Sequence, residues 1–548
     1  MAHMLEGGML VATDPGLAAF APSSALIGEV HWRGQARLAD RDDVLAEVCR
    51  LSPSQIVDRI WGSYLLFLGG NGRDAARIVR APFGDIPCRW IDQDTRVLAV
   101  SSPGLLKAFG TPRPKVAWTE TLLYLLATEL PRATTCLAGV HELPSGACLE
   151  VAEEGANVRP VWSPWPFAMD AVASDDPGEA AERVARAVDL AVAGRTAAAK
   201  ASVLLLSGGL DSAVVAAAMA RAGRSFASLN MVTRQRSGDE RGYARAVADA
   251  TGSPFIERLR TTEAIDWDDP APASLPRPSH RIFRQPSLVA ARSVAAEHGA
   301  DLVIDGGGGD NMFCSLQSVA PVLDRLQVAG LGRGAWQSAR EMAFLCDVGL
   351  GAIACKLVER LITRRVRFGW LVDPSFLVRD ALDLSGQATA HPWLEPPDSA
   401  LPGQAAHVAL VLAASSLADN LPADGAAAVV SPLVAQPLAE AVLGVRSWLW
   451  FANGRNRAPV RQGFAGRLPA RSLARQGKGT PAGFMAEIVG SERARLRELL
   501  LDGLLVANGV ADRAALEAFL SDSGPPRDFD FARVLQIADA ERWARLWT

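Results

Sequence analysis

A glycine-rich turn between an apolar run and a helix-forming run decides the fold of this chain. It reads Val203-Leu204-Leu205-Leu206-Ser207-Gly208-Gly209-Leu210-Asp211-Ser212, and a helix-prone segment from Ala213 to Ala222 follows it. The apolar run predicts a buried strand, and the glycines predict a tight turn into the helix. Backbone N–H groups in such a turn can approach an anion, and the helix N-terminus adds a partial positive charge. The stretch therefore predicts a strand–turn–helix unit that binds phosphate.

The same alternation of strands and helices continues on both sides of this turn. An amphipathic helix is predicted over Glu179 to Val192, and a strand over Phe226 to Val232 precedes a helix over Arg241 to Thr251. A third strand, from Asp301 to Asp305, runs into a second glycine-rich turn. Apolar strands that alternate with helices predict an α/β fold with a parallel sheet covered on both faces.

The rest of the chain differs in character on either side of this unit. Residues up to about 160 are predicted to form short strands and turns, such as Trp61 to Leu68 and Arg96 to Val100. The segment Pro160-Val161-Trp162-Ser163-Pro164-Trp165-Pro166 cannot continue a helix and is predicted to link two domains. We place these domains at residues 1–165 and 166–548.

Two further stretches stand out in the second domain. Residues 266–286 contain five prolines and are predicted to form a long loop. From about Val319 onward the chain is predicted to be mostly helical, with a break over Pro392 to Pro402.

Composition excludes several classes of protein. The 548 residues are 49% hydrophobic and 21% charged, which is typical of a globular chain of two or three domains. The net charge of -4 argues against a nucleic-acid partner, and no apolar run is long enough for a transmembrane segment. Seven scattered cysteines without a CxxC pair predict reduced, mostly buried thiols in a cytoplasmic protein. Seven histidines without metal-ligand spacing argue against zinc.

Carboxylates accompany both glycine turns. The hydroxyls of Ser207 and Ser212 can donate to phosphate oxygens, and Asp211 between them suggests a bridging Mg²⁺. The second turn, Ile304-Asp305-Gly306-Gly307-Gly308-Gly309-Asp310, follows a strand of the same predicted sheet. Ligands bind at the carboxyl edge of such sheets, so the four glycines are expected to leave room for a bulky ligand, and Asp310 could supply a second carboxylate.

The hexapeptide Ser207 to Ser212 matches the pyrophosphate loop of the N-type ATP pyrophosphatases, which cleave ATP between the α and β phosphates. About 200 residues precede the loop. In this order of parts the chain resembles the asparagine synthetase family, in which a class II glutaminase-like domain precedes the synthetase domain. Further matching segments are Trp61-Gly62-Ser63-Tyr64, Arg80-Ala81-Pro82-Phe83-Gly84-Asp85-Ile86-Pro87, Thr135-Cys136-Leu137-Ala138-Gly139-Val140, Leu143-Pro144-Ser145-Gly146 and Asp239-Glu240.

The resemblance implies a fold, a ligand and a set of residues. The fold is a β-rich α+β glutaminase-like domain, followed by a doubly wound parallel-sheet ATP pyrophosphatase domain with a helical C-terminal part. Asp211 and Asp310 would hold Mg²⁺ and act in catalysis together with Lys478. The residues implied to bind ATP are Leu206, Ser207, Gly208, Gly209, Leu210, Asp211, Ser212, Met231, Val232, Asp305, Gly306 and Gly307.

Departures from the family pattern narrow the expected chemistry. A class II glutaminase uses an N-terminal cysteine, whereas the first cysteine here is Cys49, so we expect no glutamine hydrolysis and a structural role for this domain. The family usually has GADE where this chain has Gly308-Gly309-Asp310-Asn311. Gly307 stands where relatives carry a tyrosine or glutamate, so no general base is evident.

Two branches of the family use an internal amine in place of glutamine: the β-lactam synthetases and the lasso-peptide cyclases. The only tyrosines are Tyr64, Tyr124 and Tyr243, so the tyrosine dyad of the β-lactam synthetases is missing. The C-terminal segments that resemble lasso-peptide cyclases are Ser431-Pro432-Leu433-Val434-Ala435-Gln436-Pro437-Leu438, Ser447-Trp448-Leu449-Trp450, Gly454-Arg455-Asn456-Arg457 and Gln476-Gly477-Lys478-Gly479.

Basic residues of this C-terminal part have two interpretations each. The resemblance implies that Lys478, one of five lysines, lies against the phosphates and the adenylate oxyanion, and the alternative is a solvated surface lysine. Arg455, Arg457 and Arg461 could bind peptide carboxylates, and a solvated helix face explains them almost equally well.

We therefore expect an ATP-dependent macrolactam synthetase that resembles lasso-peptide cyclases. It would adenylate an Asp or Glu side chain of a precursor peptide, and the peptide's N-terminal amine would then close the ring and release AMP. A leader-binding protein and a leader peptidase are expected partners. Three alternatives stay open: a β-lactam or other small-molecule amide synthetase, an ammonia-dependent asparagine synthetase, and an inactive scaffold.

Overall fold

The computed structural model describes most of the chain. It covers residues 2–5, 9–12, 18–70, 75–93, 96–153, 155–169, 174–234, 239–268, 275–363, 366–419, 427–475, 477, 482–522 and 530–548. Lys478, which the sequence predicts to be catalytic, lies outside the described residues.

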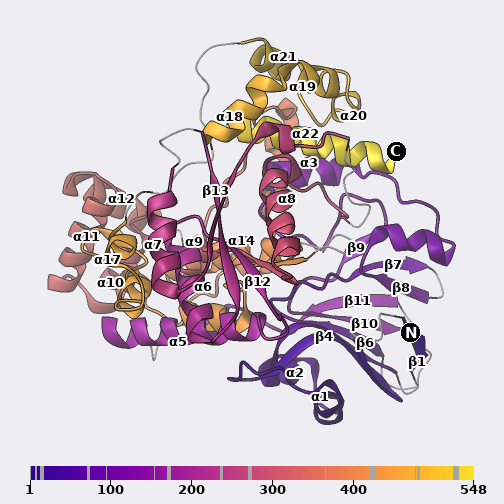
Figure 1. The fold of residues 1–548 in the computed structure, drawn as a ribbon, viewed down its shortest axis with the longest axis horizontal. Helices are drawn as coiled ribbons and strands as arrows, with labels where there is room; N and C mark the ends of the chain where they lie inside the picture. Colours follow the sequence, from indigo (N-terminus) through magenta and orange to yellow (C-terminus); the bar gives the residue numbers. More distant parts are fainter. Residues whose placement is uncertain are drawn as a thin grey trace.

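A parallel sheet forms the centre of the molecule (Figure 1). Its five strands lie in the order β14-β13-β12-β15-β16, and every neighbouring pair is parallel. The three predicted strands are confirmed, and two strands were not predicted. The bounds are β12 Ser202–Leu205, β13 Phe226–Val232, β14 Phe255–Leu259, β15 Leu302–Ile304 and β16 Ala428–Val430.

Helices cover both faces of this sheet, as predicted. Val203, Leu229 and Val303 point to one face and pack in a cluster with Ala291 and Val294 of α8 (Arg281–Glu297). Alternate strand residues point to the opposite face, where α5 (Pro177–Arg195), α6 (Leu210–Arg221) and α7 (Arg241–Thr251) lie in succession. The centre of the sheet is therefore buried on both sides, which explains the continuous apolar runs in β12 and β15.

The strand order reverses beside β12. The chain proceeds from β12 outward to β13 and β14, and then crosses back to β15 on the other side of β12. The loops after β12 and β15 therefore lie side by side at the carboxyl edge of the sheet, where open α/β sheets bind their ligands. Both glycine turns lie at this switch point.

The prediction of a long loop over residues 266–286 is wrong for its last residues, from 281 to 286. Helix α8 begins at Arg281, and Pro286 lies inside it. The carboxylate of Asp539, on α22 (Asp530–Trp547), accepts hydrogen bonds from the backbone N–H groups of Arg281 and Ile282. A distant residue therefore caps this helix, so its start could not be found from the local sequence.

The N-terminal part is built from antiparallel strands, as the β-rich prediction requires. A six-stranded sheet has the order β11-β10-β6-β5-β4-β3, and a three-stranded sheet has the order β8-β7-β9. Three short helices in this part were not predicted. The elements are β1 Ala2–Met4, β2 Leu10–Ala12, β3 Ala18–Ala21, β4 Ser24–Trp32, α1 Arg41–Val48, α2 Pro53–Arg59, β5 Ile60–Leu68, β6 Ala76–Arg80, β7 Arg89–Gln93, β8 Arg96–Val100, α3 Trp118–Leu126, β9 His141–Glu142, β10 Ala147–Ala152 and β11 Gly155–Pro160.

The predicted linker is a buried junction. Trp162 is buried, and its indole Nε1 donates to the Glu440 carboxylate at 3.1 Å. The same carboxylate accepts from Arg33 of the N-terminal part and from Gln436 at 2.9 Å. The boundary at residue 165 stays a prediction, because α4 (Trp165–Met169) starts there inside this packed contact.

The C-terminal half is mostly helical, as predicted, and the break at Pro392 contains only a single 3₁₀ turn. In Figure 1, α10–α12 extend to one side of the sheet and α18–α22 cover its upper end. The elements are α9 Gly309–Met312, α10 Ala320–Ala329, α11 Arg333–Leu345, α12 Leu350–Thr363, α13 Ser385–Ala388, α14 Pro402–Ser415, α15 Gln436–Leu443, β17 Phe451–Ala452, β18 Arg455–Asn456, α16 Ala458–Gly463, α17 Ala470–Ala474, α18 Ala482–Ser491, α19 Arg493–Leu500, α20 Leu504–Ala507 and α21 Arg513–Ser521, before α22.

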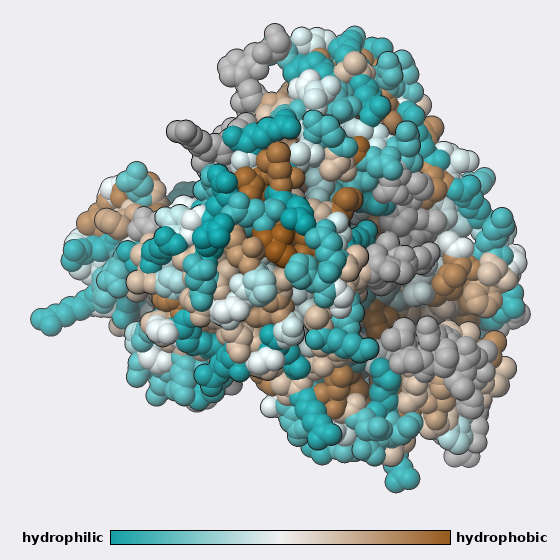
Figure 2. Space-filling view, in the orientation of Figure 1, coloured by the Kyte–Doolittle hydropathy of each residue, from teal (hydrophilic) through white to brown (hydrophobic). Residues whose placement is uncertain are grey.

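The surface is mainly polar on the face shown in Figure 2, where hydrophobic side chains lie in small separate patches. Within the described ranges, no helix combines the length and the apolar character that a bilayer crossing requires.

We expect Glu440→Ala to lower the free energy of unfolding by about 3 kcal/mol, because it leaves Arg33 and the buried Trp162 indole without their acceptor. The control is Glu47→Ala, which removes an exposed ion pair with Arg59 and should cost less than about 1 kcal/mol. Equilibrium denaturation by urea measures both. Equal losses for the two variants would show that the junction does not depend on Glu440.

Candidate functional site

The first glycine turn joins β12 to α6 with its polar groups turned toward one another. Ser207 Oγ and Ser212 Oγ lie 3.2 Å apart, and the N–H of Gly209 donates to Ser207 Oγ at 3.3 Å. Gly209 is the N-cap of α6 and has no side chain that could cap the first N–H groups of the helix. These N–H groups and the two hydroxyls form a site that suits a phosphate.

Gly208 in this turn cannot be replaced without strain. Its φ is +78°, and a Cβ at this position would lie 3.0 Å from the carbonyl oxygen of Glu240. The turn therefore needs glycine for its backbone conformation and for its contact with the start of α7.

The second glycine turn packs directly against the first. A Cβ on Gly306 would lie 2.7 Å from the backbone nitrogen of Ser212, and a Cβ on Gly309 would lie 2.5 Å from Cβ of Asp211. Protein atoms fill the space beside the other two glycines as well, since the added Cβ of Gly307 would meet Ser431 and that of Gly308 would meet Val434. The expectation that these glycines leave room for a bulky ligand is therefore wrong; they let two loops touch.

This contact brings the two predicted metal ligands together. Arg457 Nη1 donates to Asp211 Oδ1 at 2.9 Å and to Asp310 Oδ1 at 2.6 Å. Arg457 and Asp211 are buried, whereas 44% of the Asp310 side chain is exposed. The two carboxylates thus meet at one point beside the phosphate-binding turn.

The donor chemistry at this point suits Mg²⁺ with help from a ligand. Among the residues described by the structure, no group of three or more acidic, histidine or cysteine side chains could hold a metal alone. Mg²⁺ is usually bound by one or two carboxylates, and substrate phosphates and water complete its shell. Asp211 and Asp310 match that pattern, and Arg457 compensates their charge.

Asp305, one of the residues implied to bind ATP, has its side chain engaged by three other residues. Its Oδ1 accepts from the N–H of Gly307 at 2.9 Å and from Ser431 Oγ at 2.6 Å. Arg284 on α8 lies 3.8 Å from its other oxygen. Asp305 therefore fixes the second turn between α8 and the residue that follows β16.

The remaining predicted ATP-binding residues line the strand ends. The carbonyl of Leu206 accepts from Nδ2 of Asn230 at 2.7 Å, and the carbonyl of Val232 accepts from the N–H of Arg260 at 2.8 Å. Met231 packs in the cluster that contains α8. Asn230 was not predicted, because a single amide inside an apolar strand gives no motif.

Arg475 is a further residue that the sequence did not reveal. It donates to the carbonyl of Gly208 at 3.0 Å, pairs with Glu240 and lies 4.5 Å from the ring centre of Tyr243. It thereby ties the segment that leads to Lys478 to the phosphate-binding turn. Its position next to the Gln476-Gly477-Lys478 match was the one available signal.

The three arginines of the C-terminal motif have different surroundings in the structure. Arg457 is buried between carboxylates, so the solvated helix face is wrong for it. Arg461 donates to the carbonyl of Asn456 at 2.8 Å and to that of Leu473. Burial, with Arg457 and Arg455 nearby, lowers the pKa of Arg461 to about 10. Arg455 faces the neighbouring cavity.

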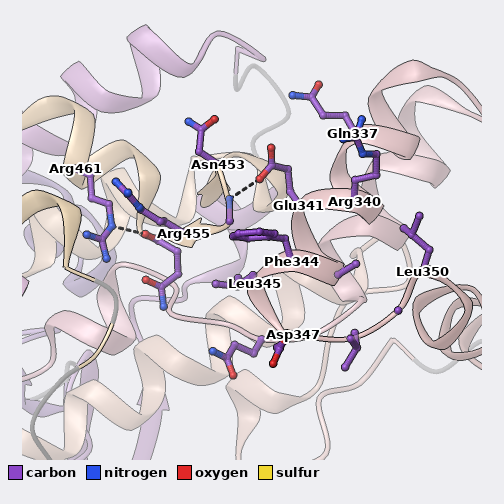
Figure 3. A pocket seen from close by; sticks show the side chains of 16 residues that line it. Gln337, Arg340, Glu341, Phe344, Leu345, Asp347, Leu350, Asn453, Arg455 and Arg461 are labelled. Carbon is purple, nitrogen blue, oxygen red and sulfur yellow. Dashed lines mark hydrogen bonds between the residues drawn. The ribbon is translucent and has the colours of Figure 1, made fainter.

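This cavity has a volume of about 1230 Å³ and lies between α11 and the β17–β18 hairpin (Figure 3). Its wall includes Phe344 and Asp347 on one side and Arg455, Asn456 and Arg461 on the other. Asn456 Nδ2 donates to Ser315 Oγ at 2.9 Å, and the N–H of Ser315 donates to the carbonyl of Asp310 at 2.9 Å. The cavity therefore borders the segment that carries Asp310.

The cysteines are free thiols, as predicted, and four of the seven are buried. Burial raises the pKa of Cys88 and of Cys136 to about 12, and that of Cys148 to about 11. These three thiols of the N-terminal part are therefore poor nucleophiles at neutral pH.

We expect Gly306→Ala to weaken ATP binding by at least about tenfold, since the added methyl group would push the second turn off the backbone of Ser212. Gly242→Ala is the control, because a Cβ there meets open space in α7 and should leave the affinity unchanged. Isothermal titration with ATP and Mg²⁺ compares the two. Unchanged affinity in Gly306→Ala would mean that loop contact does not shape the ATP site.

Comparison with known proteins agrees with this geometry. The asparagine synthase family matches residues 183–545, about two thirds of the chain, from α5 to α22. No curated protein was found to match the chain. The family supports ATP-dependent amide-bond formation, for which the paired glycine turns and the carboxylates are suited. The chain belongs to the asparagine synthase family.

Proposed function

We propose that this protein closes a macrolactam ring in a ribosomal precursor peptide at the expense of ATP. An Asp or Glu side chain of the peptide is adenylated, and the peptide's N-terminal amine attacks the acyl-adenylate. The observation that carries the proposal is the large cavity beside the Asp211–Asp310 pair.

The size of this cavity favours a peptide over a single amino acid. Sites for drug-sized ligands measure roughly 300–1,000 Å³. At about 1230 Å³ the cavity exceeds that range, and aspartate would leave most of it to water. Phe344 and Leu350 on its wall are exposed, so a long substrate can extend past them into solvent.

In the first half-reaction, a carboxylate oxygen of the peptide forms a bond to the α-phosphorus of ATP. The bond from that phosphorus to the α–β bridging oxygen breaks, and pyrophosphate leaves. Ser207, Ser212 and the N–H groups at the start of α6 hold the pyrophosphate oxygens. Asp211 and Asp310 would hold Mg²⁺, which when bound supplies positive charge to the phosphates.

In the second half-reaction, the neutral N-terminal amine attacks the acyl carbon. The bond between this carbon and the phosphate oxygen breaks, AMP leaves with the electron pair, and one proton passes to solvent. We assign no general base, since Gly307 has no side chain and Asp305 is engaged by Ser431. Most of the acceleration then comes from holding the folded peptide with its amine beside the acyl-adenylate.

Lys478 is assigned to the charge that develops on the phosphates and on the adenylate oxyanion, as the family resemblance implies. Arg475 supports this assignment, because it fixes the preceding part of the segment to Gly208. A leader-binding protein and a leader peptidase are the proposed partners, since a leaderless peptide must reach the cavity.

Mass spectrometry of nucleotides and peptides tests the proposal. With ATP, Mg²⁺ and a leaderless precursor peptide, we expect AMP, pyrophosphate and a peptide lighter by one water. AMP without peptide dehydration would replace the peptide by a small-molecule acceptor, and formation of asparagine from aspartate and ammonia would assign a synthetase of free asparagine. An absence of AMP with the partner proteins present would favour a scaffold.

We expect Asp211→Asn to reduce AMP formation by at least about a hundredfold, because the turn loses a carboxylate that would hold the metal. Asp502→Asn removes an exposed carboxylate on the far helical layer and should leave the rate unchanged. Coupled assay of pyrophosphate release measures both. Retention of the full rate by Asp211→Asn would remove Asp211 from the proposed chemistry.

A further inference from the structure

We propose that Arg455 binds a carboxylate of the substrate inside the cavity between α11 and the β17–β18 hairpin. The inference rests on the proposed function and deepens it, because it assigns the chemical group that this cavity recognises. Arg455 would hold the carboxylate that is to be adenylated.

Arg455 lines the cavity, and none of the residues that the structure describes is an acceptor for its guanidinium group. Within the ranges that the structure covers, no carboxylate or carbonyl accepts a hydrogen bond from it, and its Nε is buried. Its neighbours are committed, since Arg457 binds Asp211 and Asp310, and Arg461 binds two backbone carbonyls. Because Arg455 also lines the cavity, its guanidinium group can donate to an acceptor on a ligand there.

The backbone around Arg455 is fixed, so the guanidinium is presented by a rigid element. The N–H of Gly454 donates to Glu341 Oε2 on α11 at 2.6 Å, and Asn456 Nδ2 donates to Ser315 Oγ at 2.9 Å. Figure 3 shows Arg455 beside Arg461 at the hairpin end of the cavity, with the ring of Phe344 to their right. A rigid positive group at the end of a large cavity is suited to orient a substrate.

The positive charge around this end of the cavity also favours binding of an anion. Arg455, Arg457 and Arg461 gather there, and the carboxylates of Asp211 and Asp310 both bind Arg457. The low pKa of Arg461 reports in part the repulsion from the two other guanidinium groups. A carboxylate that forms two parallel hydrogen bonds with Arg455 would relieve this repulsion.

The position of Arg455 favours a substrate carboxylate over a phosphate of ATP. The cavity wall contains Arg455 and Arg461, but none of the residues from Ser207 to Ser212. Arg457, which does not line the cavity, is the arginine of this group that contacts the first glycine turn, through Asp211. A carboxylate on Arg455 would face the nucleotide from the cavity side, as attack on the α-phosphorus requires.

Arginine labelling tests this site without any need for turnover. The full-length protein is treated with hydroxyphenylglyoxal, and labelled arginines are mapped by mass spectrometry with glutarate, glutaramide or inorganic pyrophosphate present. We expect Arg455 to react faster than Arg457 and Arg461, and glutarate alone to protect it. Protection by pyrophosphate and not by glutarate would assign Arg455 to the nucleotide and overturn the proposal, as would labelling that no anion changes.

Kinetics give a second, independent readout. We expect Arg455→Gln to raise the KM for the peptide by at least about tenfold and to leave the KM for ATP within about twofold, because one charged pair is lost from the peptide alone. Arg455→Lys keeps the positive charge but cannot form two parallel hydrogen bonds, so its KM for the peptide should lie between those of the wild type and Arg455→Gln. Arg186→Gln, at an exposed ion pair on α5, is the control and should change neither constant. An equal rise in both KM values for Arg455→Gln would contradict the assignment.

The labelling also separates the two proposals. Protection by glutarate in a protein that never dehydrates a peptide would overturn the macrolactam function and leave the carboxylate site in place. Dehydration of a peptide without protection of Arg455 would do the reverse.

Discussion

The contact between two glycine turns is the constraint on which the rest of the site depends. The backbone of Ser212 and the side chain of Asp211 occupy the space that a Cβ on Gly306 or Gly309 would need. This approach is possible because the strand order reverses between β12 and β15, so both turns emerge at the same edge of the sheet. Without it Asp211 and Asp310 could not share one guanidinium nitrogen.

Three arginines around the site have different roles. Arg457 balances the two carboxylates that are suited to a metal, and Arg475 secures the phosphate-binding turn through Gly208 and Glu240. Arg455 is left to face the cavity. Arginine serves all three tasks because its charge persists at any physiological pH and its donors are fixed in a plane.

The sequence predicted what local periodicity encodes. The strands over residues 226–232 and 96–100 and the helix over residues 241–251 have the predicted bounds, because each shows its period without help from distant residues. Strand β14 was missed since Glu257 and Arg258 interrupt its apolar pattern, and β16 was missed because it has only three residues. The start of α8 was missed because Asp539 supplies its cap from the other end of the chain.

Of the candidate site, too, the sequence predicted the part that a local motif encodes. The hexapeptide from Ser207 to Ser212 indicated the phosphate site, since a strand, glycines and hydroxyls follow one another directly. What it could not indicate was which of three neighbouring arginines binds the carboxylates. That depends on the left-handed backbone of Arg457, with φ of 58°, and on the approach of a hairpin from more than 200 residues away.

The capping of α8 by Asp539 has a consequence for how this protein is made. The segment before α8 is held at several points, because the carbonyl of Pro278 accepts from the Tyr124 hydroxyl and that of Leu275 from the Trp543 indole. On the ribosome, the N-terminal contact can form early, whereas α22 emerges among the last parts of the described chain. The cover that α8 forms over one face of the sheet is therefore completed only after α22 has been made, long after the strands of the sheet.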